Sequence, residues 1–313
     1  MYPPFTTYLH QWRSKLKRKL TSKPSGEFWE KTPLNSPDTV YKEILKSIEN
    51  QLPMCVARVG SVEAKIILWS QNITIPCYPF GRWKTSFDDT ISGVTNAGIR
   101  PRSRHSYQQY GQLAFDLLSY IDHWAVWCTN YEAVLINQCN HKPSLCEGEI
   151  LAPTMQFPIH WIDALDTKRI LIISPFQDSI QHQIPKLLDI WPSRQWLINS
   201  QITFYKFPYL IDDNCLLNWW DVYNEIATIL TTDQYDVALF GCGGLGLPLA
   251  ALAKRSGKIG IHLGGHLQLL FGIYGNRHLE QEWHRCCINS FWIRPLSHEV
   301  AQTANRVEKS CYW

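Results

Sequence analysis

Residues 236–266 read DVALFGCGGLGLPLAALAKRSGKIGIHLGGH, and this stretch decides the fold class. The apolar run DVALF is typical of a buried strand and leads into the glycine-rich turn GCGGLG. Helical spacing follows in LGLPLAALAKRS, and IGIHLG is a second apolar run that ends in glycine. A strand, a glycine turn, a helix and another strand make a βαβ unit, whose two strands lie parallel in one sheet.

The same alternation continues through most of the chain. Strands are expected in MCVARVG (54–60), AVWC (125–128), RILIIS (169–174), QWLINS (195–200) and TFYKF (203–207). Helices are expected over 41–52, 61–71, 107–121, 131–139, 175–191, 215–230 and 266–273. This order predicts an α/β protein, with a Rossmann-like parallel sheet and helices on both faces. We expect one main domain, 39–313, after a basic extension rich in Pro and Ser, 1–38.

The glycine turn satisfies the pattern G-x-G-x-x-G at Gly241, Gly243 and Gly246. A nicotinamide or S-adenosylmethionine site also needs an acidic residue at the end of the next strand, where it holds the ribose hydroxyls. That strand ends instead in HLGGH (262–266), and the next acidic residue is Glu280. The turn is therefore interpreted either as a loop that a diphosphate or sugar approaches, or as glycines that let a helix and a strand pack closely.

Composition limits the partners and the compartment. The formal charge is +3 over 313 residues, which is too small for nucleic acid to be expected as the main partner. The sequence contains no signal-peptide core and no long apolar span, so we expect a cytoplasmic protein. A basic cluster in the extension could touch an anionic membrane surface, although a solvated helix face is the ordinary use of such residues. The cluster comprises Arg13, Lys15, Lys17, Arg18 and Lys19.

The cysteine and tryptophan residues each have more than one possible use in the protein. Cys139, His141 and Cys146 offer three metal ligands within CNHKPSLC, but no fourth ligand stands beside them. Fourteen tryptophans serve either a hydrophobic core or a surface that stacks on sugars or bases.

Polar side chains follow several predicted strands at their carboxyl ends, where open parallel sheets bind ligands. Arg58 and Glu63 follow the first strand. An arginine there clamps a phosphate, and a glutamate holds a metal or removes a proton, unless the two form a buried salt bridge. Ser179 and Gln183 follow RILIIS, where they could bind sugar hydroxyls or belong to an ordinary helix cap. Asn96 lies in the arginine-rich loop GVTNAGIRPRSRH, which could act as a lid or an anion contact.

Five segments carry a resemblance to known proteins. They are ARVGSVEAKIILW (57–69), NAGIRP (96–101), SPFQDSIQHQ (174–183), the stretch 240–278, of which 241–277 is the most specific part, and VEKSCYW (307–313). In these segments the chain is similar to a family of mostly uncharacterised bacterial proteins, often associated with cell-surface polysaccharide loci. That family resembles, more distantly, the GT-D type glycosyltransferases, which are single-domain Rossmann-like enzymes that transfer sugars from nucleotide-sugar donors.

The resemblance implies roles for particular residues. GT-D enzymes carry the motif R-x-G-D-G-E, in which Asp and Glu bind a divalent metal. The chain has Arg58, Gly60, Ser61 and Glu63 at these positions, so Ser61 replaces the aspartate. The implied protein is a glycosyltransferase with a nucleotide-sugar donor, an unidentified acceptor and Mg²⁺ or Mn²⁺ at Glu63.

Together, the motif and the strand ends give a set of expected site residues. The expected catalytic residues are Glu63 and His262. The expected substrate-binding residues are Arg58, Gly60, Ser61, Asn96, Ser179, Gln183, Gly241, Gly243, Gly264, Gly265 and Gln268.

Two other classes of function stay open. A nicotinamide- or S-adenosylmethionine-dependent enzyme would use GCGGLG, and the missing ribose-binding acid argues against it. A non-catalytic nucleotide- or glycan-binding protein would need no metal, and Ser61 in place of the aspartate favours it.

Overall fold

The stretch 236–266 forms the βαβ unit that its sequence predicts. In the computed structural model, which describes residues 26–76, 82–152, 159–192, 194, 196–307 and 310–313, β8 spans Val237–Phe240 and β9 spans Ile259–His262. Helix α10, Gly246–Arg255, connects them. The two strands pair in parallel, as a crossover through a helix requires.

Seven strands make one sheet in the order β5-β4-β1-β9-β8-β6-β7, and every pairing is parallel. The chain starts at β1, moves outward through β4 to β5, and then builds the other half from β6 to β9. Strand β9 returns to lie beside β1, so the two halves meet at this pair. The remaining strands are β1 (Met54–Ala57), β4 (His123–Val126), β5 (Ser144–Glu147), β6 (Arg169–Ser174) and β7 (Gln201–Lys206). A separate antiparallel pair is formed by β2 (Thr74–Pro76) and β3 (Arg82–Lys84).

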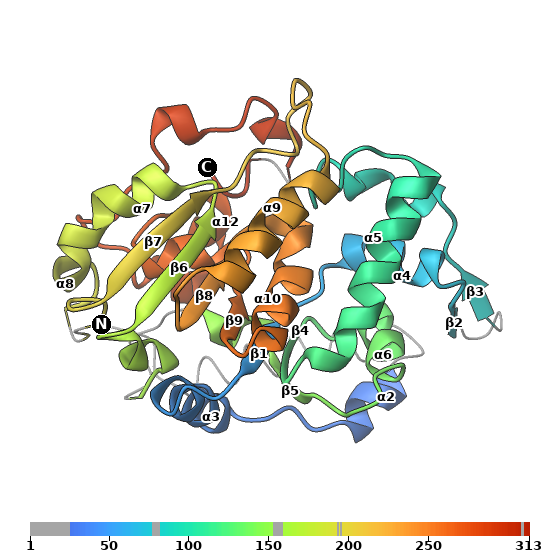
Figure 1. The fold of residues 1–313 in the computed structure, drawn as a ribbon, viewed down its shortest axis with the longest axis horizontal. Coiled ribbons are helices and arrows are strands. Elements are labelled where there is room, and N and C mark those ends of the chain that lie inside the picture. Colours follow the sequence, from blue (N-terminus) through green and yellow to red (C-terminus); the bar gives the residue numbers. More distant parts are fainter. Residues whose placement is uncertain (1–25, 77–81, 153–158, 193, 195, 308–309) are drawn as a thin grey trace.

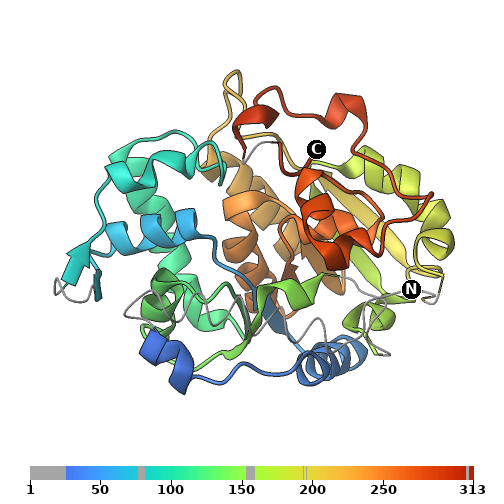
Figure 2. The same cartoon turned by 180° about the vertical axis from the view of Figure 1, so that it is seen from behind.

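Helices cover both faces of the sheet, because each face carries its own cluster of buried apolar side chains. One cluster is built with α4 (Ser61–Ser70), α5 (Arg104–Leu117), α6 (Asn130–Ile136), α9 (Trp219–Thr232) and α10. The other uses α3 (Pro37–Glu49), α7 (Gln177–Gln183), α8 (Leu187–Ile190), α11 (His266–Leu270) and α13 (Glu282–Arg285). Figure 1 looks onto α5, α9 and α10, and Figure 2 shows the opposite side with the C-terminal segment (red) in front. The predicted single α/β domain with a Rossmann-like parallel sheet is confirmed.

Three local predictions differ from the structure. The segment QWLINS forms no strand in its described part, since Leu197 lies in a turn with a φ of 63°. The helix expected over 175–191 is broken into α7 and α8 by a 3-10 turn that contains Pro185, because proline has no N–H to donate within a helix. Strand β5 was not expected, since its four residues, SLCE, are too short to show a pattern.

The N-terminal extension is described only from residue 26 onward. Helix α2 spans Gly26–Lys31, and Trp29 in it is buried in the core. The Asn35 N–H donates to the carbonyl of Leu145 in β5 at 2.7 Å. Residues 26–36 therefore contact the main domain, whereas the basic cluster lies outside the described residues. No helix in the described ranges combines the length and the hydropathy needed to cross a membrane.

Tryptophan serves mainly as a core residue among the side chains that the structure describes. Five tryptophans rank among the largest fully buried side chains, namely Trp124, Trp161, Trp191, Trp196 and Trp219. Their burial favours the core interpretation over a stacking surface for these positions.

Candidate functional site at the carboxyl ends of the strands

A pocket opens at the carboxyl ends of β6, β7, β8 and β9, the edge of a parallel sheet where ligands bind. The empty space between its walls, including the part that is open to solvent, is about 720 Å³. Apolar and aromatic residues form most of its wall. The wall includes Pro175, Phe176, Phe207, Pro208, Leu210, Ile211, Leu267, Val307 and Trp313.

About half of the residues expected from the sequence meet in this pocket. They are Asn96, Gly241, Gly243, Gly264, Gly265 and Gln268. The arrangement follows from topology, because β8 and β9 are neighbours and their glycine turns end at the same edge of the sheet. The loop that holds Asn96 packs directly against the first of these turns.

The glycine turn GCGGLG shows why glycine is needed there. Gly243 has a φ of +57°, and a Cβ at this position would lie 2.9 Å from the carbonyl oxygen of Ala97. The N–H of Gly244 donates to the same oxygen at 2.8 Å. The close-packing interpretation therefore accounts for Gly243, while Gly241 and Gly243 also line the pocket.

The sequence prediction missed several pocket residues, and two sets of them come from other parts of the chain. One is the loop 207–211, which follows the end of β7 and could have been found from its place after TFYKF. The other is the pair Tyr312 and Trp313. The indole N–H of Trp313 donates to the carbonyl of Glu299 at 2.9 Å, and a Cβ on Gly265 would lie 2.4 Å from the Tyr312 ring.

The described lining of the pocket contains no charged side chain. Its polar side chains belong to Asn96, Ser174, Tyr209, Gln268 and Tyr312. Gln268 is only 2% exposed, and its Nε2 donates to the carbonyl of Tyr312 at 3.1 Å. Its Oε1 has no hydrogen-bond partner. Because an unsatisfied buried acceptor is costly, Gln268 is suited to receive a donor group of a neutral ligand.

Arg58 lies behind one wall of the pocket. Its Nη1 donates to the carbonyl of Leu263 at 3.1 Å, and its guanidinium stacks on Trp127 at 4.6 Å from the ring centroid. A Cβ on Gly264 would lie 3.5 Å from the Arg58 Cζ, so a single glycine separates the guanidinium from the pocket. Burial lowers the pKa of Arg58, while Tyr312 and the Glu149 carboxylate act in the opposite direction.

Glu63 and Ser61 lie at the start of α4 and do not line the pocket. The Glu63 carboxylate folds back over the helix start, since a Cβ on the N-cap residue Gly60 would lie 2.3 Å from its Oε2. The Glu63 carboxylate is one of the charges that raise the pKa of Arg58, and the alternative of a salt bridge between the two stays a prediction. Ser61 is exposed. The catalytic and metal-binding roles of Glu63 stay predictions.

His262 ends β9, but its ring packs on α10 and not against the pocket. A Cβ on Gly246 would lie 2.1 Å from the His262 Cδ2. Burial, followed by the nearby Arg58, lowers the pKa of His262 to about 3. The imidazole is therefore neutral near pH 7, and a base with so low a pKa is poorly matched to proton removal at that pH.

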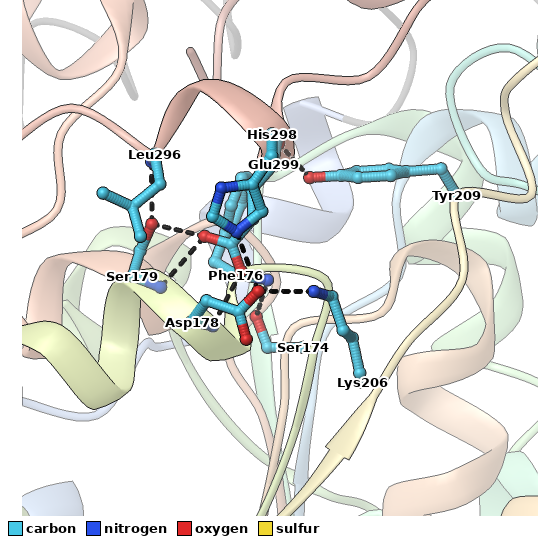
Figure 3. Close-up of polar contacts among 9 residues, drawn as sticks. All are labelled: Ser174, Phe176, Asp178, Ser179, Lys206, Tyr209, Leu296, His298 and Glu299. Carbon is cyan, nitrogen blue, oxygen red and sulfur yellow. Dashed lines mark hydrogen bonds and ion pairs between the residues drawn. The ribbon is translucent and has the colours of Figure 1, made fainter.

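Ser179 and Gln183 lie outside the pocket, where other parts of the chain occupy their polar groups. In Figure 3 the Glu299 carboxylate points at the start of α7. It accepts hydrogen bonds from the N–H groups of Asp178 at 2.7 Å and Ser179 at 3.0 Å, and from the Ser179 hydroxyl. Gln183 is completely buried and donates to two backbone carbonyls, those of Gly272 and Phe291. Both residues therefore have structural partners, and their predicted contacts with sugar hydroxyls stay predictions.

Metal-ligand types converge in two places among the described residues. One group is Glu149, His266 and His284, and the other is Asp178, His298 and Glu299. Glu63 belongs to neither group. The three candidate ligands of CNHKPSLC do not converge either, and they contact four different backbone carbonyls. The contacts run from Cys139 to Leu118 and Leu135, from His141 to Ile121, and from Cys146 to Trp124.

Comparison with known proteins gives no relative: no family model, no curated protein and no solved structure matches the chain.

Proposed function

We propose that this protein binds a nucleotide-sugar at the carboxyl ends of β1, β8 and β9 and transfers the glycosyl group to an acceptor. One observation carries the proposal. A pocket with neutral polar groups and aromatic walls lies one glycine, Gly264, away from the partly buried cation Arg58. A nucleotide-sugar has the same two parts, because its base and sugars are neutral and its diphosphate is anionic.

The pocket suits the neutral part of such a ligand. Bases and sugars stack on aromatic side chains, and Tyr209, Tyr312 and Trp313 all line the pocket. Asn96 and Gln268 offer amide groups for hydroxyls or base edges. Well-formed sites of this kind are mostly apolar, with a few polar groups that fix the ligand's orientation.

Arg58 suits the diphosphate, which departs with its negative charge when the glycosyl group is transferred. A preorganised cation in a site that excludes water stabilises this developing charge. Arg277 provides a second cation nearby, since it stacks on Tyr312 at 4.8 Å from the ring centroid and lowers the pKa of Arg58 through charge repulsion.

A second candidate, a nucleotide-sugar-binding protein without turnover, is favoured by a different observation. No carboxylate belongs to the described lining of the pocket, and the Glu63 carboxylate lies against Gly60. A binding protein needs the pocket and Arg58 but no general base.

Binding and turnover measured separately test both candidates. Thermal melting is followed with UDP-sugars and GDP-sugars, with and without Mn²⁺, and with NAD and S-adenosylmethionine as controls. We expect a nucleotide-sugar to raise the melting temperature, and release of nucleoside diphosphate to distinguish the transferase from the binding protein. A shift with NAD or S-adenosylmethionine alone would overturn the proposal.

A further inference from the structure

Arg58 lies close to two polar side chains, His266 and Glu149, that no catalytic or binding role yet explains. We infer that His266 and Glu149 position Arg58, so that one fixed edge of its guanidinium receives a ligand oxyanion. The inference rests on the proposed function, because it specifies how the diphosphate is held. His266 and Glu149 act through Arg58 and are positioning residues.

The hydrogen-bond directions follow from elementary chemistry. Arg58 Nη1 lies 3.4 Å from Nδ1 of His266. A guanidinium only donates, so Nδ1 must accept and carries no hydrogen. The hydrogen of the neutral imidazole is then on Nε2, which lies 3.4 Å from Oε2 of Glu149. The three side chains therefore form a directed chain, with Arg58 donating to His266 and His266 facing the carboxylate.

The surroundings hold this chain rigidly. His266 is buried, and the Glu149 side chain is 12% exposed. Stacking on Trp127 and the bond to the Leu263 carbonyl fix the plane of the Arg58 guanidinium. Glu149 and Arg58 are both partly buried, so the attraction between their charges is less screened than on the surface, and Glu149 offsets part of the cost of burying the arginine.

One edge of Arg58 stays available to a ligand. Within the described part of the chain, both guanidinium hydrogen bonds run through Nη1. The Nε and Nη2 groups form the parallel pair of donors that matches two oxygens of a phosphate. A Cβ on Gly264 would lie 3.5 Å from Arg58 Cζ, 3.6 Å from Nε and 3.7 Å from Nη1, so a larger residue at this position would cover the guanidinium.

The same cluster includes a grouping of metal-ligand types, but the tautomer disfavours a metal. Ligand atoms of Glu149, His266 and His284 lie within 4.8 Å of one another. A metal at His266 Nε2 would require the hydrogen on Nδ1, where it would face a donor of Arg58. The positive charge of Arg58 would also repel the ion.

Two substitutions of His266 form a matched test. The amide oxygen of asparagine reaches the place of Nδ1, whereas the amide of glutamine reaches the place of Nε2. We expect His266→Asn to keep the affinity for inorganic pyrophosphate and UDP close to that of the parent. His266→Gln should lower this affinity about tenfold or more, which corresponds to the loss of a hydrogen bond to a charged group. Glu149→Gln should lower the affinity less, because the glutamine amide keeps the contact with His266 and only the negative charge of the carboxylate is lost. Equal losses in the two His266 variants, at equal melting temperatures, would overturn the inference.

A measurement without ligand separates this inference from the proposed function. In ¹⁵N-histidine-labelled protein, we expect Nδ1 of His266 to resonate as an unprotonated nitrogen and Nε2 as a protonated one. The opposite tautomer would overturn the inference. So would stoichiometric Zn²⁺ binding that His266→Gln and His266→Asn both abolish, because the three side chains would then form a metal site. If the tautomer is as expected but neither pyrophosphate nor UDP binds the parent, the proposed function fails while the positioning of Arg58 stands.

Discussion

The turns after β6 and β8 lie at the same edge of the sheet, but different groups contact them. After β6, the start of α7 receives the Glu299 carboxylate, which is supplied by the chain more than a hundred residues later. After β8, the glycine turn packs on Ala97 and leaves a pocket beside it. The sequence shows polar or glycine-rich residues at both turns. The difference teaches that the polar groups of a turn after a strand are open to a ligand only where no other part of the chain occupies them.

Removing Glu299 should give the largest effect, because it breaks the filled turn. Glu299→Ala leaves two backbone N–H groups and the Ser179 hydroxyl without their acceptor, at a position only 1% exposed. We expect the free energy of unfolding to fall by about 2–4 kcal/mol, measured by urea denaturation. Glu280→Ala, at an exposed position, is the control and should change it by less than about 0.5 kcal/mol. Equal stability of the two variants would show that the carboxylate is not a cap.

Alanine at two glycines tests the open turn. Gly243 and Gly257 both have positive φ, +57° and +76°, but a Cβ meets the Ala97 carbonyl only at Gly243. Gly257→Ala should cost about 1 kcal/mol for backbone strain alone. Gly243→Ala should cost about 1–3 kcal/mol more, because the loop 96–99 must move. Equal losses in urea denaturation would mean that the loop adapts and that close packing does not explain this glycine.

Two buried glutamines test whether a role in binding can be separated from a role in stability. Gln183 and Gln268 each have an Oε1 without a hydrogen-bond partner, but only Gln268 lines the pocket. Gln268→Met should weaken nucleotide-sugar binding about tenfold, because a ligand donor loses its acceptor. Gln183→Met should instead lower the free energy of unfolding by about 1–2 kcal/mol and leave the dissociation constant unchanged. Calorimetry measures binding and urea denaturation measures stability in both variants. A loss of binding in Gln183→Met and a loss of stability alone in Gln268→Met would contradict the two roles.

The sequence predicted the fold well where the signal is local. Runs such as RILIIS and DVALF are long and apolar, and each is flanked by turn residues, so the βα alternation is visible without the structure. QWLINS failed because Trp196 and Leu197 are buried in a turn, and burial in a turn gives the same apolar pattern as a strand.

The site was predictable only in part. Gly264 and Gln268 follow a strand end that the sequence shows, and topology brings them to the pocket. Trp313 reaches the pocket, and Glu299 reaches the start of α7, through contacts between segments far apart in the chain. No pattern within one segment reports such contacts, which explains why the internal cap of α7 was not foreseen. His266 was not singled out, because its role depends on the direction of a hydrogen bond from Arg58.

The smallest expected effect lies at the rim of the filled turn, where Asp178 is hydrogen-bonded to Lys206 and His298 (Figure 3). These two bonds lower the pKa of Asp178 below its ordinary value. A carboxylate with a lowered pKa in the folded state stabilises the protein above its unfolded pKa of about 3.9, and this contribution is lost as the pH falls through the lower folded value. Because the side chain is about a third exposed, solvent screening limits the contribution to about 0.5 kcal/mol. Asp178→Asn should therefore differ from the parent slightly at pH 7 and not at all near pH 2, whereas a difference that grows on acidification would contradict the ion-pair explanation.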